Sequence, residues 1–238
     1  MSNTRSSRSI NAYQFNPARE LYVAASRAFR VQFGGNPWAR EAKKLRELWE
    51  ISKFGVGFGQ LRGGPIEVRL IDEEPADGQI RFGSEVVDLQ TTVVNRQGRA
   101  PDREYRERKK SKQRGRFSPE ATEEQTNEWI AQAVAAKEGK RYARSRPLYL
   151  IVHANFRKNG LDIRGLVERV TRIGPSSFDE VWLLTGIIGP GDSFAIVRLF
   201  PDPNGRYLLY NIASEKTLNP QDLDFPFGPM EIRDNRPV

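Results

Sequence analysis

The first third of the chain places apolar side chains at helical spacing. Residues 16–33 are predicted to form one helix, with Pro17 in its first turn and two glycines at its end. Residues 36–53 are predicted to form a second helix, whose apolar stripe consists of four residues, Trp38, Ala42, Leu45 and Trp49. The glycine-rich stretch 55–65 is expected to be a loop, and it is too irregular for a nucleotide-binding fingerprint.

From Ile66 onward polar and apolar residues alternate, which is the period of a β-strand. Residues 66–70, 79–82 and 85–94 are predicted strands, and the last of them is rich in β-branched side chains. A cluster of turn-forming residues at 74–78 separates the first two strands. The short connections predict a set of three antiparallel strands.

The second half of the chain alternates helices with apolar strands. Helices are predicted at 118–138 and 162–172, and strands at 148–152, 178–185 and 194–200. The order of elements is therefore two helices, three strands, and then helix–strand pairs that end in two strands. This order favours an α/β fold with a central mixed β-sheet flanked by helices on both faces.

Composition and patterning indicate one globular domain with polar extensions. The chain is 38% hydrophobic and 29% charged, as in globular proteins and unlike disordered ones. We expect a single α/β domain over residues 16–218, with a basic insertion at 95–117. Residues 1–15 are expected to be disordered, and the proline-rich residues 219–238 to form an extended tail.

Features that the sequence lacks indicate where in the cell the protein is located and whether it associates with a membrane. No apolar run approaches the roughly 18 residues that a membrane-spanning helix needs, and the N-terminus does not resemble a secretory signal. The absence of cysteine excludes disulfides and thiolate zinc sites and fits a reducing compartment. We therefore expect a cytoplasmic protein without a membrane partner.

Three polar residues at the second and third predicted strands are the main candidates for chemistry. Asp88 and Gln90 share one face of the strand 85–94, because side chains alternate along a strand, and Asp77 lies in the turn before the neighbouring strand. An aspartate and a glutamine on a buried face need a partner. A hard cation such as Mg²⁺ supplies one through oxygen ligands and can also activate water for phosphodiester cleavage. The alternative is that Asp77 only forms a turn and that Asp88 and Gln90 face solvent.

These residues and the order of elements resemble the PD-(D/E)XK nuclease superfamily. Segment 74–77 (EPAD) resembles its Pro-Asp element with one residue inserted, and segment 88–90 (DLQ) occupies the place of its (D/E)-x-K element. The resemblance covers roughly residues 36–185, mostly through element order. It implies a restriction-endonuclease-like core and hydrolysis of DNA, less often RNA, with Mg²⁺ or Mn²⁺ as cofactor.

The same resemblance implies further site residues on the two helices that flank the three strands. Asp77 and Asp88 are the implied metal ligands, and a glutamate on the first helix is a third. Glu41 borders the apolar stripe of that helix, whereas Glu47 lies opposite it, so Glu41 is preferred. Gln90 replaces the motif lysine. Some members of the superfamily place Glu or Gln at that position, and others draw the lysine from the following helix, where Lys137 and Lys140 are the candidates.

A strongly basic segment follows the strand that carries Asp88. The whole chain has a formal net charge of +8, which favours a polyanionic partner. Ten candidate phosphate contacts lie in the segment: Arg96, Arg99, Arg103, Arg106, Arg108, Lys109, Lys110, Lys112, Arg114 and Arg116. The alternative is a solvated, flexible insertion.

Three functional hypotheses follow from the sequence. The first is a Mg²⁺-dependent nuclease or nuclease-like domain with nucleic acid, DNA before RNA, as its partner. The second is a non-catalytic module on the same fold that binds nucleic acid or a protein, and the third is a structural subunit of a phage or mobile-element assembly. A homodimer is compatible with each of them. His153, the only histidine, excludes multi-histidine metal sites and is expected to be structural or a lone general base.

Overall fold

The computed structural model describes residues 11–33, 36, 39–95, 121–154, 161–186, 192–201 and 207–218. Within this part of the chain the helices are α1 (Ala18–Gln32), the 3₁₀ turn η1 (Arg40–Ala42), α2 (Lys43–Arg62), α4 (Glu123–Glu138) and α5 (Ile163–Ile173). The strands are β1 (Asn16–Pro17), β2 (Glu67–Leu70), β3 (Gly78–Phe82), β4 (Glu85–Val94), β5 (Leu148–Ala154), β6 (Glu180–Gly186), β7 (Ser193–Phe200), β8 (Tyr207–Asn211) and β9 (Lys216–Thr217).

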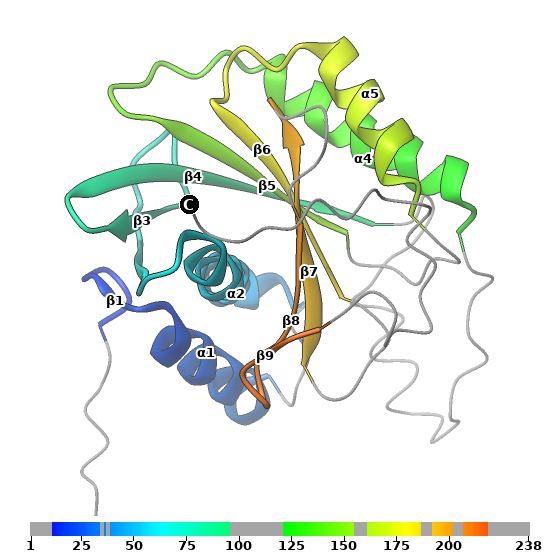
Figure 1. The fold of residues 1–238 in the computed structure, drawn as a ribbon. Helices are drawn as coiled ribbons and strands as arrows, with labels where there is room; N and C mark the ends of the chain where they lie inside the picture. Colours follow the sequence, from blue (N-terminus) through cyan, green and yellow to red (C-terminus); the bar gives the residue numbers. More distant parts are fainter. Residues whose placement is uncertain are drawn as a thin grey trace, which may run out of the picture.

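The strands form one mixed sheet in which the spatial order follows the sequence order from β1 to β9. Strands β4, β5 and β6 are parallel to one another, and the remaining neighbours are antiparallel. Helices α1 and α2 lie on one face of the sheet, and α4 and α5 lie on the other (Figure 1). The expected α/β class, with a mixed sheet between helices, is confirmed.

Each face of the sheet has its own hydrophobic core. The alternate residues Val87 and Leu89 of β4 pack with α2, whereas Val94 packs with α4 and α5. Because side chains alternate along a strand, Asp88 and Gln90 belong to the α4 side. Both are buried, so the alternative that they face solvent is wrong.

The predicted loop at 55–65 is mostly helix, because α2 continues to Arg62. Its glycines allow the helix to pack closely on the sheet. A Cβ added at Gly55 would lie 2.8 Å from Val68 Cγ1, and one at Gly57 would lie 3.0 Å from Ile196 Cδ1. The helix passes so close to the sheet that only glycine fits. It ends at Gly63, whose φ of 71° is the left-handed conformation common at helix C-termini.

The edges of the sheet were not predicted from the sequence. The edge strands β1 and β9 have two residues each, β8 lies beside β9, and none of the three carries the alternation that marks a half-buried strand. Residues 11–15, expected to be disordered, lie along β2, where Ala12 accepts a hydrogen bond from the backbone N–H of Leu70. Phe15 stacks against the guanidinium groups of Arg69 and Arg81.

Helix α4 begins at a Thr122 capping box with Gln125, a few residues after the predicted start. None of the helices described here has both the length and the apolar character that crossing a bilayer requires.

Candidate functional site

The candidate site lies where β3 begins beside β4. Asp77 directly precedes β3, and its backbone N–H donates to the carbonyl of Leu89 at 2.8 Å, which extends the β3–β4 ladder by one residue. One oxygen of its carboxylate, Oδ2, accepts hydrogen bonds from the Thr91 backbone N–H (2.7 Å) and hydroxyl (3.1 Å). Asp77 is thus more than a turn former, because its side chain is held against the strand that carries Asp88 and Gln90.

Asp88 belongs to a polar ladder across three strands on the α4 side. The pairing register places Arg69 beside Gln79 and Gln79 beside Asp88. Arg69 Nε donates to Gln79 Oε1 at 2.9 Å, and Gln79 Nε2 donates to Asp88 Oδ1 at 2.7 Å. These bonds compensate the burial of the Asp88 carboxylate, since a buried charge without a hydrogen-bond donor is strongly unfavourable.

Gln90 connects β4 to α4. Its side-chain amide donates to the Pro75 carbonyl, and its Oε1 accepts a hydrogen bond from Lys137 Nζ at 2.5 Å. Lys137 lies 47 positions further along the chain, in the last turn of α4. Lys137, one of the two lysines expected on the following helix, therefore contacts Gln90.

The surroundings of Lys137 are mixed in charge. Burial lowers the pKa of its ammonium group below the ordinary lysine value; nearby Asp77 and Glu74 oppose this shift, whereas Lys140 and Lys43 add to it. Lys140 itself is exposed, and no described hydrogen bond or ion pair joins its side chain to Asp77, Asp88 or Gln90.

Tyr142 also lies close to this site, although the sequence did not single it out. Burial raises the pKa of its phenol, and Glu74 and Asp77 raise it further. Its ring packs against Phe178 with centroids 5.5 Å apart. It follows α4 in an irregular segment, so no periodicity could have marked it.

The glutamates of the first helical segment are arranged differently from the prediction. Glu41 is exposed in the turn η1, whereas Glu47 is buried on α2 beside Lys43 and Lys44. Lys44 in turn lies 3.5 Å from the carbonyl of Ile71, whose N–H donates to the Asp77 carbonyl. Glu47 is thus the α2 carboxylate nearest to the site by this chain of contacts. The predicted stripe does face the core, since Ala42 is buried and Leu45 and Trp49 pack against the core, but the buried face of α2 is wider and includes Glu47. Trp38 itself lies outside the described residues.

A second buried polar cluster lies between α1, α2 and the far end of β5. His153 Nδ1 lies 2.9 Å from Glu50 Oε1, and both side chains are buried. Lys53 is one turn further along α2, with its ammonium 4.6 Å from the Trp49 ring and 5.2 Å from the Phe194 ring. Burial lowers the pKa of Lys53 to about 8, and Asp192 opposes this shift. The structural role expected for His153 fits its place in this cluster.

Replacing Lys53 with methionine is expected to make stability less dependent on pH. The folded-state pKa of about 8 lies below the ordinary value of 10.5, so the unfolded chain binds more protons between these two pH values and the unsubstituted protein gains stability as the pH rises through them. Below pH 8 the buried ammonium costs roughly 3 kcal/mol. We expect the stability advantage of Lys53→Met to shrink by about 2 kcal/mol between pH 7.5 and pH 9.5.

Urea unfolding followed by circular dichroism at both pH values measures this change. Lys216→Met, at an exposed position in β9, is the matched control and should show no such change. A constant difference between Lys53→Met and the unsubstituted protein over this range would contradict the account.

The hydrogen bonds of Asp77 and Asp88 limit the metal site that the two aspartates could form. Mg²⁺ is commonly held by one or two carboxylates and keeps several waters, so Asp77 and Asp88 are a sufficient donor set in kind. Each has one oxygen engaged by a protein donor, Thr91 in one case and Gln79 in the other. Across the described ranges, no three or more His, Cys, Asp or Glu side chains are grouped to hold a metal ion. The pair therefore fits at most a site completed by water and substrate oxygens.

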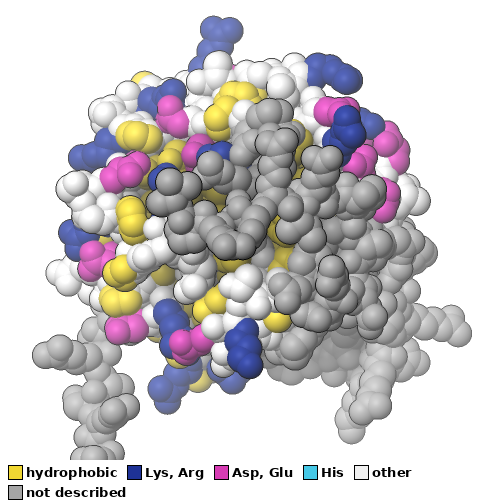
Figure 2. All heavy atoms as spheres, in the orientation of Figure 1, with side chains coloured by type: hydrophobic (Ala, Val, Ile, Leu, Met, Phe, Trp, Pro, Cys, Tyr) yellow, Lys and Arg dark blue, Asp and Glu magenta, His cyan; other side chains and the backbone are white. Residues whose placement is uncertain are grey.

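The basic candidates, from Arg96 to Arg116, lie outside the described residues. Their ten positive charges against three acidic residues account for +7 of the net charge of +8, so the rest of the chain is almost neutral. Figure 2 agrees with this for the face it shows, where lysine, arginine, aspartate and glutamate side chains are interspersed over the described surface.

Comparison with known proteins adds no relative: no protein-family model, curated protein or solved structure matches the chain.

Proposed function

We propose that this chain is a divergent nuclease-like domain of the PD-(D/E)XK type that hydrolyses phosphodiester bonds in nucleic acid, DNA before RNA. The observation that carries the proposal is the 2.5 Å contact between Lys137 Nζ and Gln90 Oε1. A nuclease of this type needs a cation beside the scissile phosphate. Lys137 supplies one at the strand position where Gln90 has replaced the motif lysine.

The element order gives independent support. Helix α2, the antiparallel strands β2 to β4, helix α4 and the parallel strand β5 follow one another as the resemblance implies. A restriction-endonuclease-like core is therefore part of the proposal. The absence of cysteine supports a reducing, cytoplasmic location for the activity.

Each site residue has a proposed role that follows from its contacts. Lys137 stabilises the negative charge that develops on the phosphate, and Gln90 positions Lys137 because it is itself held by the Pro75 carbonyl. Asp77 and Asp88 would hold Mg²⁺ or Mn²⁺, which when bound lowers the pKa of water and polarises the phosphate. Gln79, supported by Arg69, keeps the Asp88 carboxylate oriented.

The proposed partner is nucleic acid, bound through the basic segment 96–116. This segment begins two residues after the end of β4, which is the strand that carries Asp88 and Gln90. Neutralising several phosphates makes affinity fall steeply as salt rises. Electrostatic attraction to the backbone is largely independent of sequence, which suits a chain whose positive charge is concentrated in one segment.

Metal-dependent cleavage is the test of the proposal. We expect plasmid DNA to be nicked or cut in the presence of Mg²⁺ or Mn²⁺ and to stay intact with EDTA. Calorimetry should show Mn²⁺ binding that is lost in Asp88→Asn and kept in Glu85→Gln, an exposed carboxylate on the same strand. Binding and cleavage that persist in Asp88→Asn would remove Asp88 from the site.

A non-catalytic binding module is the second candidate. It is favoured by the engagement of both aspartates with protein donors and by the lack of a three-residue ligand group in the part of the chain described. A chain that shifts labelled DNA in a gel, takes up no Mn²⁺ in calorimetry and cuts neither DNA nor RNA belongs to this class.

A further inference from the structure

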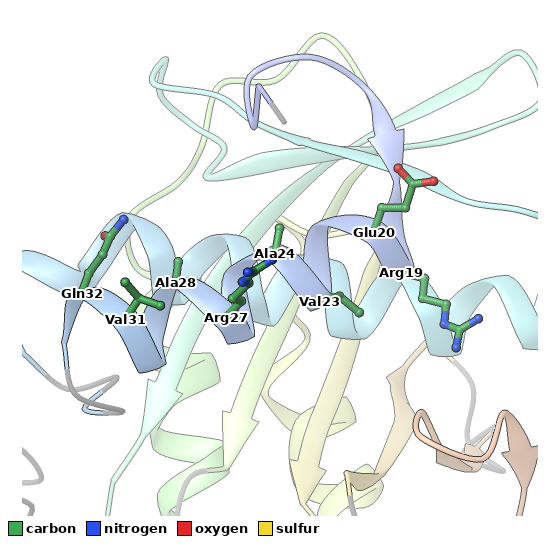
Figure 3. Close-up of a pocket in the computed structure, with 8 residues that line it drawn as sticks. All are labelled: Arg19, Glu20, Val23, Ala24, Arg27, Ala28, Val31 and Gln32. Atoms are coloured by element: carbon green, nitrogen blue, oxygen red, sulfur yellow. The ribbon is translucent and has the colours of Figure 1, made fainter. Parts of the chain in front are cut away.

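Helix α1 has an outward face that no described part of the protein covers. Its inward positions, Leu21, Tyr22, Ala25 and Phe29, are buried in the core shared with α2. The opposite positions are spaced by three and four residues in turn: Pro17, Glu20, Ala24, Arg27 and Val31. Figure 3 shows a pocket that runs along this side of α1, and all of its described lining residues belong to the helix.

This face is apolar at positions where a monomer normally carries polar residues. Val23 is 53% exposed and Val31 is 76% exposed, and among the described residues Tyr13 is the only other large hydrophobic side chain with comparable exposure. Ala24 and Ala28 lie between the two valines and leave room for close approach of another helix. Grouped exposed apolar residues of this kind mark interaction sites more often than isolated ones do.

Two charges on the same face have no partner within the described residues. Glu20 and Arg27 form no ion pair or hydrogen bond there, whereas the neighbouring Arg19 pairs with Glu215 and Arg30 donates to the Ser26 carbonyl. Glu20 and Arg27 are seven residues apart, which is two helical turns, and so they lie on one side of α1. The face therefore carries opposite charges two helical turns apart.

We propose that α1 is the contact through which two copies of this chain pair, antiparallel and related by a two-fold axis beside Val23 and Ala24. In such a pair a residue of one copy faces the residue of the other that lies equally far from the axis in the opposite direction. Glu20 of each copy then faces Arg27 of the other. The same axis brings Pro17, which is exposed, to within one residue of the level of Val31, and it places the small Ala24 at the crossing point.

Three features of α1 complement the same helix in a second copy: its charged, its apolar and its small side chains. The Glu20–Arg27 ion pair forms twice, the contact between Pro17 and Val31 also forms twice, and the small Ala24 lies where the two helices come closest. A parallel pairing would instead stack Glu20 on Glu20 and Arg27 on Arg27, and like charges at close range are unfavourable. The observations therefore select one orientation.

The dimer is expected to be weak. Helix α1 has 15 residues and is about 22 Å long at 1.5 Å per residue. One helix face of this length buries less than the roughly 800 Å² per partner of a standard stable interface. Association should therefore depend on protein concentration in the micromolar range or above. Helix α1 lies on the opposite side of the sheet from α4, so the pairing does not rest on the proposed nuclease function.

Sedimentation of the full-length chain over a wide concentration range tests the proposal. We expect a reversible monomer–dimer equilibrium in the unsubstituted protein. Glu20→Arg and Arg27→Glu should each weaken dimerisation by about tenfold or more, because each places like charges opposite one another. The double variant Glu20→Arg/Arg27→Glu should restore it, since the two charges are exchanged across the axis.

Arg172→Glu, at an exposed position of α5, is the control for a change in net charge and should leave dimerisation unchanged. All substituted positions are exposed, so circular dichroism should show the native fold in every variant. A protein that stays monomeric at all concentrations, a dimer indifferent to both single substitutions, or a double variant no better than the single ones would each overturn the proposal.

Discussion

Replacing Lys137 with glutamine is expected to slow phosphodiester cleavage by about 100-fold or more, because removing one preorganised donor from a developing negative charge typically has an effect of this size. Glutamine keeps the length and polarity of the side chain but not its charge. Lys137 is half-buried at the end of α4, and its Nζ contacts Gln90 beside Asp77. The loss should appear as a lower rate constant at saturating metal and DNA.

Lys140→Gln is the matched control for this experiment. Lys140 lies three residues further on and is exposed, so its charge is screened by solvent and salt. We expect it to change the cleavage rate by less than about tenfold. Equal losses in the two variants would indicate that only the overall positive charge of this region matters, which contradicts a specific role for Lys137.

Replacing Gly78 with alanine is expected to lower the free energy of unfolding by about 3 kcal/mol, at the upper end of the usual range for overpacking. An alanine Cβ at this position would lie 2.6 Å from the Arg69 carbonyl oxygen and 2.6 Å from Ile51 Cδ1. The first neighbour is backbone of the adjacent strand and cannot rotate away. Either β2 and β3 separate or α2 moves off the sheet, and both lose packing next to Asp77.

Gly186→Ala measures the general effect of adding a methyl group at a glycine in a strand. Gly186 ends β6, and an added Cβ would meet nothing within 4 Å. Its effect should stay within about 0.5 kcal/mol, as for ordinary surface substitutions. Urea unfolding of both variants gives the comparison. A Gly78→Ala variant as stable as Gly186→Ala would show that the sheet relaxes around the new methyl group without loss.

The architecture was predictable where the pattern of burial is regular. The alternation from Ile66 to Val94 identified β2, β3 and β4, and the apolar runs identified β5, β6 and β7, because half-buried and fully buried strands each leave a distinct pattern. The edge strands β1 and β9, and β8 beside β9, leave none. The pairing of β1 also depends on β2, from which helices α1 and α2 separate it in the sequence.

The extent of α2 was not predictable from local signals. Glycines usually end helices or form loops, and Gly55, Gly57 and Gly59 were interpreted in that way. In the folded chain they let the helix approach β2 and β7 closely, and this packing outweighs their low helix propensity. Glu41 was preferred to Glu47 because it borders the predicted apolar stripe, but the buried face of α2 is wider than that stripe and includes Glu47.

The candidate site was predictable in part. Asp88 and Gln90 could be identified because polar residues are unusual on a strand with so many β-branched neighbours, and Asp77 because it precedes the neighbouring strand; the structure places Asp77 next to β3 and the other two on the adjacent β4. Lys137 could be identified as a candidate site residue only through the resemblance to a nuclease family. Gln79 and Tyr142 could not have been found, because their roles depend on the pairing register and on a chain segment without periodicity.

The most direct measurement for the central claim is the cleavage rate of a variant in which two residues are exchanged, Gln90→Lys/Lys137→Gln. The two side chains touch in the folded chain, so the exchange keeps a lysine and a glutamine at the same place while returning the lysine to the strand. If Lys137 takes the part of the motif lysine, the double variant should recover to within about tenfold of the unsubstituted rate, from the roughly 100-fold loss of Lys137→Gln alone. A correctly folded double variant that is no more active than Lys137→Gln, or an unsubstituted protein that cleaves no nucleic acid with Mg²⁺ or Mn²⁺, would contradict the account.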